Sequence, residues 1–206
     1  MKAKSIILII VVVVALISVF YSFQGAGDDK AYSELIEKER QEKDHFMRTS
    51  SESPFVENKD NFKGLKYFPV APKYRIIASL NPVSQKDVVV LHTSDGKEQH
   101  YLKYAYAEFE LDGIKNKLLI LEIMDMGQFR GNLFLAFGDD SSAKETYGAG
   151  RYLDVRKTPG SSTITLDFNQ AYNPYCAYTD KYSCPLPMPE NLLAVAIKAG
   201  EKIYEH

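Results

Sequence analysis

Arg151 is the residue of this sequence whose type and surroundings most directly suggest chemistry. In a strand over residues 151–156, Arg151 shares one face with Leu153 and Val155, and this apolar face is expected to point to the core. A buried guanidinium is costly without a carboxylate partner. Three interpretations stay open: a buried ion pair that fixes the fold, a pocket that binds an anionic ligand, or a side chain that extends to solvent. The candidate partners are Glu145 and Asp167, with Glu190 third.

Tyrosines and side-chain amides gather around Arg151 in the sequence. Residues 139–191 hold 6 of the 14 tyrosines and both cysteines. Asp167 and Asn169 alternate with Leu166 and Phe168, so they either face water or line a groove under the tyrosine-rich loop. Tyrosine rings in loops form apolar walls with hydrogen-bonding tips, which suits a ligand pocket or a protein contact. The candidate binding cluster of polar residues is therefore Glu145, Tyr147, Arg151, Asp167, Asn169, Asn173 and Glu190.

Cys176 and Cys184 are separated by seven residues. In an exported domain the default expectation is a disulfide that closes this loop and contributes about 2–3 kcal/mol to stability. A zinc site would need two further ligands, and the four histidines stand far away in the sequence. A nucleophilic cysteine would lack a histidine nearby in the sequence. No metal and no cofactor are therefore predicted.

The stretch from Asp139 to Glu145 offers several side-chain oxygens, which raises the question of calcium. Its spacing does not match the EF-hand loop, and Lys144 would oppose a cation, so a surface turn is predicted instead. The sequence shows no glycine-rich phosphate loop, no nucleophile elbow and no metalloprotease helix. No catalytic residue is assigned.

Short runs of residues also carry a family resemblance. The runs are Glu145–Tyr147, Gly150–Asp154, Asp167–Asn169, Tyr172–Tyr178, Cys184–Pro185, Glu190–Asn191 and Ala199–Lys202, with Gly64–Leu65, Tyr67–Pro69 and Tyr74–Arg75 upstream. They resemble an uncharacterised bacterial and archaeal family, domain of unknown function 1684, over roughly Glu39 to the C-terminus. The resemblance implies an exported or anchored β-rich domain and supplies no catalytic mechanism.

The composition of the 206 residues is that of an ordinary globular protein. Its 25 basic and 27 acidic side chains give a formal net charge of -2, and 45% of the residues are hydrophobic. No basic excess is available to neutralise a phosphate backbone, which argues against a nucleic-acid partner. The 11 phenylalanines and 14 tyrosines supply a core and argue against low-complexity disorder.

The N-terminus predicts a membrane segment. Lys2 and Lys4 precede a run of 19 uncharged residues, Ser5 to Phe23, whose helix would nearly span the hydrocarbon layer. Residues 1–23 are therefore predicted to be a transmembrane anchor with the bulk of the chain outside, at the periplasmic or cell surface. A cleaved signal sequence stays open as the alternative, although Gln24-Gly-Ala26 is a poor cleavage site.

The rest of the chain predicts a charged helix followed by one β-rich domain. Residues 24–54 are predicted to form a stalk helix, Asp28 to Arg48, with a linker after it. Residues 55–206 are predicted to form the domain. Ser94-Asp95-Gly96 and Asp112-Gly113 predict two hairpins. Short strands are also predicted at residues 133–137, a continuous apolar run, and at residues 162–168, where apolar and polar residues alternate. Strands of this length and spacing predict a mainly β fold, an antiparallel sandwich or barrel-like roll.

Three functions remain in view from the sequence. The first is a membrane-anchored extracytoplasmic binding or interaction module whose partner is an unknown small ligand or an envelope protein. The second is a hydrolytic enzyme that uses two of Glu145, Asp167 and Glu190, with Arg151 as an anion clamp in a tyrosine-lined cleft. The third is a purely structural envelope protein. The absence of a recognisable catalytic motif favours the binding module.

Overall fold

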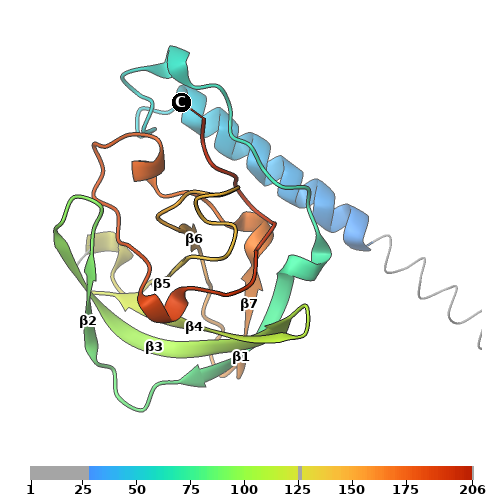
Figure 1. Ribbon diagram of the computed structural model, residues 1–206, viewed down its shortest axis with the longest axis vertical. Coiled ribbons are helices and arrows are strands. Elements are labelled where there is room, and N and C mark those ends of the chain that lie inside the picture. The colour runs from blue at the N-terminus through green and yellow to red at the C-terminus, as the bar shows by residue number, and fades with distance from the viewer. Residues whose placement is uncertain (1–27, 125–126, 206) are drawn as a thin grey trace, which may run out of the picture. The chain divides into compact units, whose positions relative to one another are not determined.

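The computed structural model of the protein describes residues 28–124 and 127–205 (Figure 1). Its two central hairpins form where the turn residues require them. Asp112 and Gly113 both adopt positive φ, 51° and 78°, and join β3 (Glu98–Leu111) to β4 (Ile114–Ile123) by a two-residue loop. Gly96 has a φ of 80° in the turn between β2 (Val88–His92) and β3. Both predicted hairpins are confirmed.

Within the described residues, seven antiparallel strands form a single sheet. The strand order is β6-β5-β4-β3-β1-β7, and β2 pairs with β3 outside this path. The remaining strands are β1 (Arg75–Pro82), β5 (Leu133–Phe137), β6 (Arg151–Leu153) and β7 (Thr163–Asp167). The sheet curves into a half-barrel, so the predicted mainly β class is confirmed. The sandwich alternative is wrong, because a sandwich needs two packed sheets.

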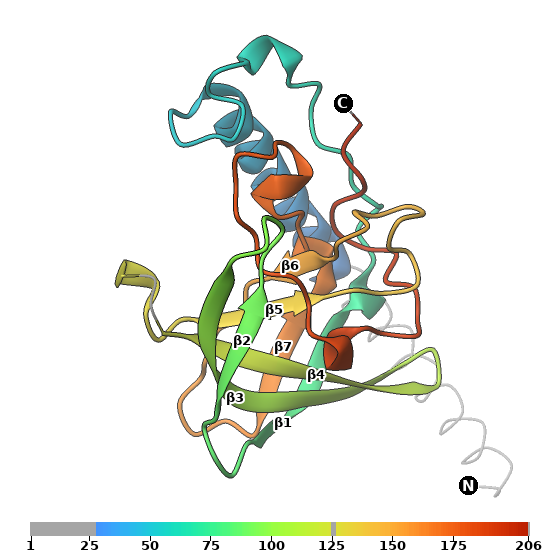
Figure 2. The same ribbon diagram turned by 60° about the vertical axis from the view of Figure 1, so that its left-hand side comes forward.

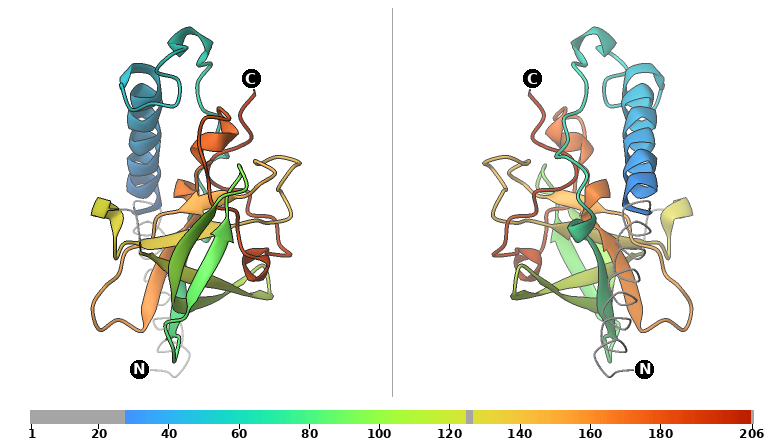
Figure 3. Two further views of the ribbon diagram at one scale, coloured as in Figure 1. Left: turned by 90° about the vertical axis from the view of Figure 1, so that its left-hand side faces the viewer. Right: turned by 90° about the vertical axis from the view of Figure 1, so that its right-hand side faces the viewer.

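The long strand β3 allows the sheet to bend. Its register against β4 shifts between Lys103 and Ala105, and such an irregularity kinks a strand and increases its twist. One half of β3 therefore pairs with β2 and the other half with β1. Figures 2 and 3 show the resulting curvature.

The main core contains side chains of the sheet and of the C-terminal segment, residues 191–204. Leu118, Ile120, Leu135, Phe137 and Phe168 pack in one cluster with Val195, Ile197 and Ala199. The C-terminal segment has no helix and no extended strand ladder, only the isolated bridges Gly138–Leu192 and Tyr67–Glu201 among the described residues. Most of its buried backbone groups must therefore find partners other than a neighbouring strand.

A helix covers residues 28–49, as predicted. By contacts between residues the described part of the chain divides into two units, with the boundary between Arg40 and Gln41. Within the second unit, Met47 packs in a small aromatic cluster with Phe55, Phe62, Tyr178 and Tyr204. The predicted domain boundaries at residues 24 and 55 remain predictions.

The predicted transmembrane anchor, residues 1–23, lies outside the described residues. Among the helices that the structure does describe, none is both long enough and apolar enough to cross a membrane.

Candidate binding pocket

Arg151 is buried in the core, as the strand alternation predicted. Its side chain is 1% exposed, while Asp154 and Arg156, which follow the three-residue strand β6, are exposed. Nη2 donates to Oδ2 of Asp139 at 2.9 Å and to the carbonyl of Ile197 at 2.8 Å, and Nη1 donates to the carbonyls of Ala199 and Glu201. The guanidinium thus binds one carboxylate and three alternate carbonyls of the C-terminal segment.

The carboxylate partner is Asp139 and none of the three predicted acids. The predicted surface turn at 139–145 is also wrong at its first residue, because the Asp139 side chain is 1% exposed. Its Oδ1 accepts from the backbone N–H of Ser141 at 2.7 Å and from that of Ile197 at 3.3 Å. The local bond to Ser141 forms a turn, which is a common behaviour of Asp at turn starts, and the bond to Ile197 joins this turn to the C-terminal segment.

The Arg151 cluster fixes the fold. Burial lowers the pKa of Arg151, and the nearby Asp139 carboxylate opposes this shift. Both terminal nitrogens are occupied by protein acceptors, and Nε has no hydrogen-bond partner among the described residues. Of the interpretations of Arg151, the buried ion pair is the one that these contacts support.

The three predicted acids lie apart from Arg151. Glu145 pairs with Lys198 at 2.8 Å on the surface. Glu190 is exposed and accepts a hydrogen bond from the Tyr106 hydroxyl at 3.1 Å. Asp167 accepts from the backbone N–H of Asn169 at 3.2 Å, as the N-cap of a short 3-10 helix, Phe168–Gln170. The structure does not bring these carboxylates together.

Tyr147 and the two asparagines of the predicted cluster also have separate positions. Tyr147 is half-buried with its hydroxyl 3.9 Å from Sγ of Cys176. Asn169 and Asn173 are fully buried. The Asn169 amide binds both the N–H and the carbonyl of Ala71, at 2.9 and 3.0 Å, which closes the predicted groove at that position. The Asn169 side chain thus supplies the hydrogen-bond partners that a neighbouring strand would otherwise give to the backbone of Ala71.

Glu201 and Asn191 are further buried polar residues that were not in the predicted cluster. Glu201 is completely buried and accepts from Lys43 at 3.0 Å, from Nδ2 of Asn173 at 2.8 Å and from the Tyr178 hydroxyl. The Asn191 amide binds the N–H and carbonyl of Leu119 and the carbonyl of Ala136. Both residues belong to the runs that carried the family resemblance, and that membership was the available signal.

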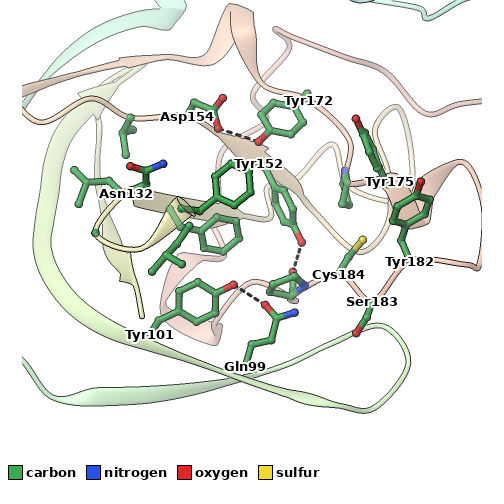
Figure 4. A pocket seen from close by; sticks show the side chains of 18 of the residues that line it. Gln99, Tyr101, Asn132, Tyr152, Asp154, Tyr172, Tyr175, Tyr182, Ser183 and Cys184 are labelled. Atoms are coloured by element: carbon green, nitrogen blue, oxygen red, sulfur yellow. Dashed lines mark hydrogen bonds between the residues drawn. The ribbon is translucent and has the colours of Figure 1, made fainter. Parts of the chain in front are cut away.

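A pocket of about 800 Å³ lies elsewhere, on the side of β6 opposite to Arg151 (Figure 4). It is formed by β3, the end of β4, β5, the segment after β6, and the loop that follows β7. Its aromatic lining residues are Tyr101, Phe129, Phe134, Tyr152, Tyr172, Tyr175 and Tyr182. None of the seven residues of the predicted binding cluster lines it.

Strand alternation produces this separation. Arg151 and Leu153 point into the main core, so Tyr152 between them points to the other side and stands in the middle of the pocket wall. Phe134 of β5 meets Tyr152 edge to face at 4.9 Å and stacks on Tyr101 of β3 at 5.2 Å. Tyr152 and Tyr172 are also edge to face, at 5.9 Å. Their rings form one continuous aromatic wall.

Hydrogen bonds hold the tyrosine rings of this wall in position. The hydroxyl of Tyr101 donates to Gln99 at 2.8 Å, that of Tyr152 to the carbonyl of Pro185 at 2.7 Å, and that of Tyr172 to Asp154 at 2.9 Å (Figure 4). Burial raises the pKa of Tyr101 to about 12 and holds the pKa values of Tyr152 and Tyr172 further above the ordinary range. All three rings are neutral at physiological pH.

The ionisable side chains other than tyrosine and cysteine in the lining are Asp154, Arg156 and Lys157. All three belong to residues 154–157, the segment that directly follows β6. Asp154 is the acceptor of the Tyr172 hydroxyl, and the Lys157 ammonium lies 5.1 Å from the ring centroid of Tyr104. Among the described residues no group of three or more His, Cys, Asp or Glu side chains could hold a metal ion.

The two cysteines lie together at one end of the pocket. Cys184 lines it, and the backbone N–H of Cys176 donates to Sγ of Cys184 at 3.2 Å. Both are free thiols in this structure. The hydrogen bond between the two side chains lowers the pKa of Cys176 to about 6 and raises that of Cys184.

The fold and the pocket define a class of protein: a β half-barrel, closed by its C-terminal segment, with an aromatic-walled pocket beside it. The chain belongs to the family described as Protein of unknown function (DUF1684), whose model matches residues 60–202. It is similar to an uncharacterized protein of Haloarcula marismortui, solved by solution NMR. The two are 36% identical, the match covers 85% of this chain and 96% of the other, and the TM-score is 0.64. No curated protein matches the chain.

Proposed function

We propose that the protein is a binding module for a small ligand with an apolar body, and that the aromatic-walled pocket is its site. The observation that carries this proposal is the set of five tyrosine rings and Phe134 around a single cavity of about 800 Å³. Ligand pockets in proteins span roughly 300–1,000 Å³ and are mostly apolar with a few placed polar groups. The lining of this pocket has that composition.

The fixed positions of the tyrosine rings favour a role of the pocket in ligand binding. Three tyrosine hydroxyls are bonded within the protein, so the rings need little ordering when a ligand arrives, and the entropic cost of binding is correspondingly lower. An apolar ligand in contact with these rings is removed from water on several sides, which is the main driving force for such binding.

The hydrolase alternative has less support. It needs a pair of carboxylates in a cleft, and the pocket is lined by one, Asp154, which is bonded to Tyr172. Glu145, Asp167 and Glu190 do not line it, and neither does Arg151. No contact of the described residues favours acid–base catalysis there.

Binding is tested with N-phenyl-1-naphthylamine, a neutral dye that fluoresces in apolar sites. The native protein is expected to bind it, and Asn132→Trp, which puts a large ring on an exposed lining residue, is expected to weaken binding at least about tenfold. The matched control is Asn81→Trp, at an exposed residue of β1 outside the pocket lining. This variant should bind the dye as the native protein does. Native-like binding by Asn132→Trp would reject the pocket as the site.

We also propose that the module is held outside the cytoplasm by its N-terminal apolar run, and that Cys176 and Cys184 form a disulfide there. The proposal rests on the uncharged run from Ser5 to Phe23 and on the contact between the two cysteines. Fractionation of the full chain is expected to recover it with membranes, and mass spectrometry without reduction to find the two cysteines linked. Recovery with the cytosol, carrying two free thiols, would contradict both parts.

A further inference from the structure

The charges around the pocket carry information about its ligand. Each lining element contributes aromatic or neutral side chains except the segment directly after β6, which contributes Asp154, Arg156 and Lys157. The lining residues of β3, β4, β5 and the loop 172–185 include no acid. Two cations thus stand at the pocket against a single carboxylate.

The one carboxylate is already bonded within the protein, and one of the cations is not. Asp154 accepts the Tyr172 hydroxyl at 2.9 Å. Lys157 contacts the ring of Tyr104. Arg156 is exposed, and no ion pair or hydrogen bond joins its guanidinium to another residue that the structure describes. A guanidinium in this situation is available for a carboxylate, sulfonate or phosphate, which it binds in a bidentate manner.

The ring arrangement indicates the shape of the ligand body. Three rings of the wall meet nearly at right angles, at 76° between Phe134 and Tyr152 and at 85° between Tyr152 and Tyr172, while Tyr101 stacks on Phe134 at 22°. A flat aromatic group can stack on one such ring while its edge meets the face of the next, which is the preferred geometry of aromatic contacts. A flexible alkyl chain gains no comparable advantage from this geometry.

We propose that the ligand is an aromatic acid: a flat ring system in the tyrosine-walled pocket with its anionic group on Arg156, and Lys157 contributing charge nearby. This inference rests on the proposed function and specifies its ligand class. The same site selects against aromatic cations, because Arg156 and Lys157 would repel them.

Two dyes with the same ring skeleton test the charge requirement. 8-Anilino-1-naphthalenesulfonate carries a sulfonate that N-phenyl-1-naphthylamine lacks. In the double variant Arg156→Gln/Lys157→Gln, affinity for the sulfonate dye is expected to fall about tenfold, with affinity for the neutral dye unchanged. Lys115→Gln, which removes an exposed positive charge outside the lining, is the control and should leave both affinities unchanged. Added salt should weaken binding of the sulfonate dye only.

The outcomes separate the two proposals. If the double variant binds the sulfonate dye as the native protein does, the anionic ligand class is rejected while the pocket can still bind neutral molecules. If neither dye binds the native protein, the proposed function fails together with this inference. Displacement of the bound dye by 2-naphthoate is expected to be stronger than by decanoate, and equal or weaker displacement would reject the aromatic body.

Discussion

Replacing Arg151 with methionine is expected to lower the free energy of unfolding by about 3–5 kcal/mol, because it leaves the buried Asp139 carboxylate without its cation. The carbonyls of Ile197, Ala199 and Glu201 lose a donor at the same time. Buried acceptors without partners each add a cost. Urea unfolding followed by circular dichroism measures the change in the native and variant proteins.

Arg156→Met is the matched control for this experiment. It makes the same substitution on an exposed residue five positions along the chain, and it is expected to change stability by less than about 0.5 kcal/mol. The double variant Arg151→Met/Asp139→Asn separates the two contributions. It removes the unpaired charge, keeps an Oδ1 acceptor for the N–H groups of Ser141 and Ile197, and leaves the three carbonyls without a donor. Equal midpoints for Arg151→Met and the native protein would show that the ion pair does not stabilise the fold.

The parts of the fold that could be predicted from the sequence are those with local causes. Asp112 and Gly113 specify a two-residue turn through their own backbone preferences, so the hairpin around them was predictable. The inward orientation of Arg151 followed from alternation along one short strand. Neither inference needed information about distant residues.

The partners of buried polar groups could not be predicted in the same way. Arg151 is satisfied by a loop acid, Asp139, and by the main chain of a segment about fifty residues away. Asn169, Asn173 and Asn191 likewise bind backbone groups of distant segments. Asn169 and Asn173 were predicted to belong to a binding cluster, whereas the contacts of all three asparagines show that they hold irregular segments to the half-barrel.

The pocket could not be predicted from the sequence for a different reason. Its tyrosines come from β3, β6 and the loop after β7, and each one alone is an ordinary core aromatic. The sequence did place Tyr152 on the face opposite to Arg151, which is the face of β6 that lines the pocket. Beyond β6 the alternation does not hold, because residues 154–157 all line the pocket. Without the curvature of the sheet nothing indicated that Tyr101 and Phe134 approach that face.

Glu201→Gln is expected to destabilise the protein by about 3 kcal/mol. All the groups that contact this buried carboxylate are donors: Lys43, the Tyr178 hydroxyl, and the backbone and side-chain N–H groups of Asn173. Glutamine has the same size but replaces one acceptor oxygen by a donor NH2. At least one N–H or O–H group is then left facing another donor in the core, and the Lys43 charge loses its partner.

Backbone geometry adds to this effect, because the segment around Glu201 cannot readily move away. Gly200 has a φ of 73°, and a Cβ there would lie 2.5 Å from the carbonyl oxygen of Ala171. The backbone is therefore packed against Ala171 and cannot shift to improve the hydrogen bonds of the glutamine side chain. Thermal unfolding compares Glu201→Gln with Glu205→Gln, which removes an exposed ion pair with Lys66 and should leave the midpoint nearly unchanged. Similar midpoints for the two variants would mean that the buried carboxylate contributes no more than a surface one, and the C-terminal segment would then be held by its apolar side chains.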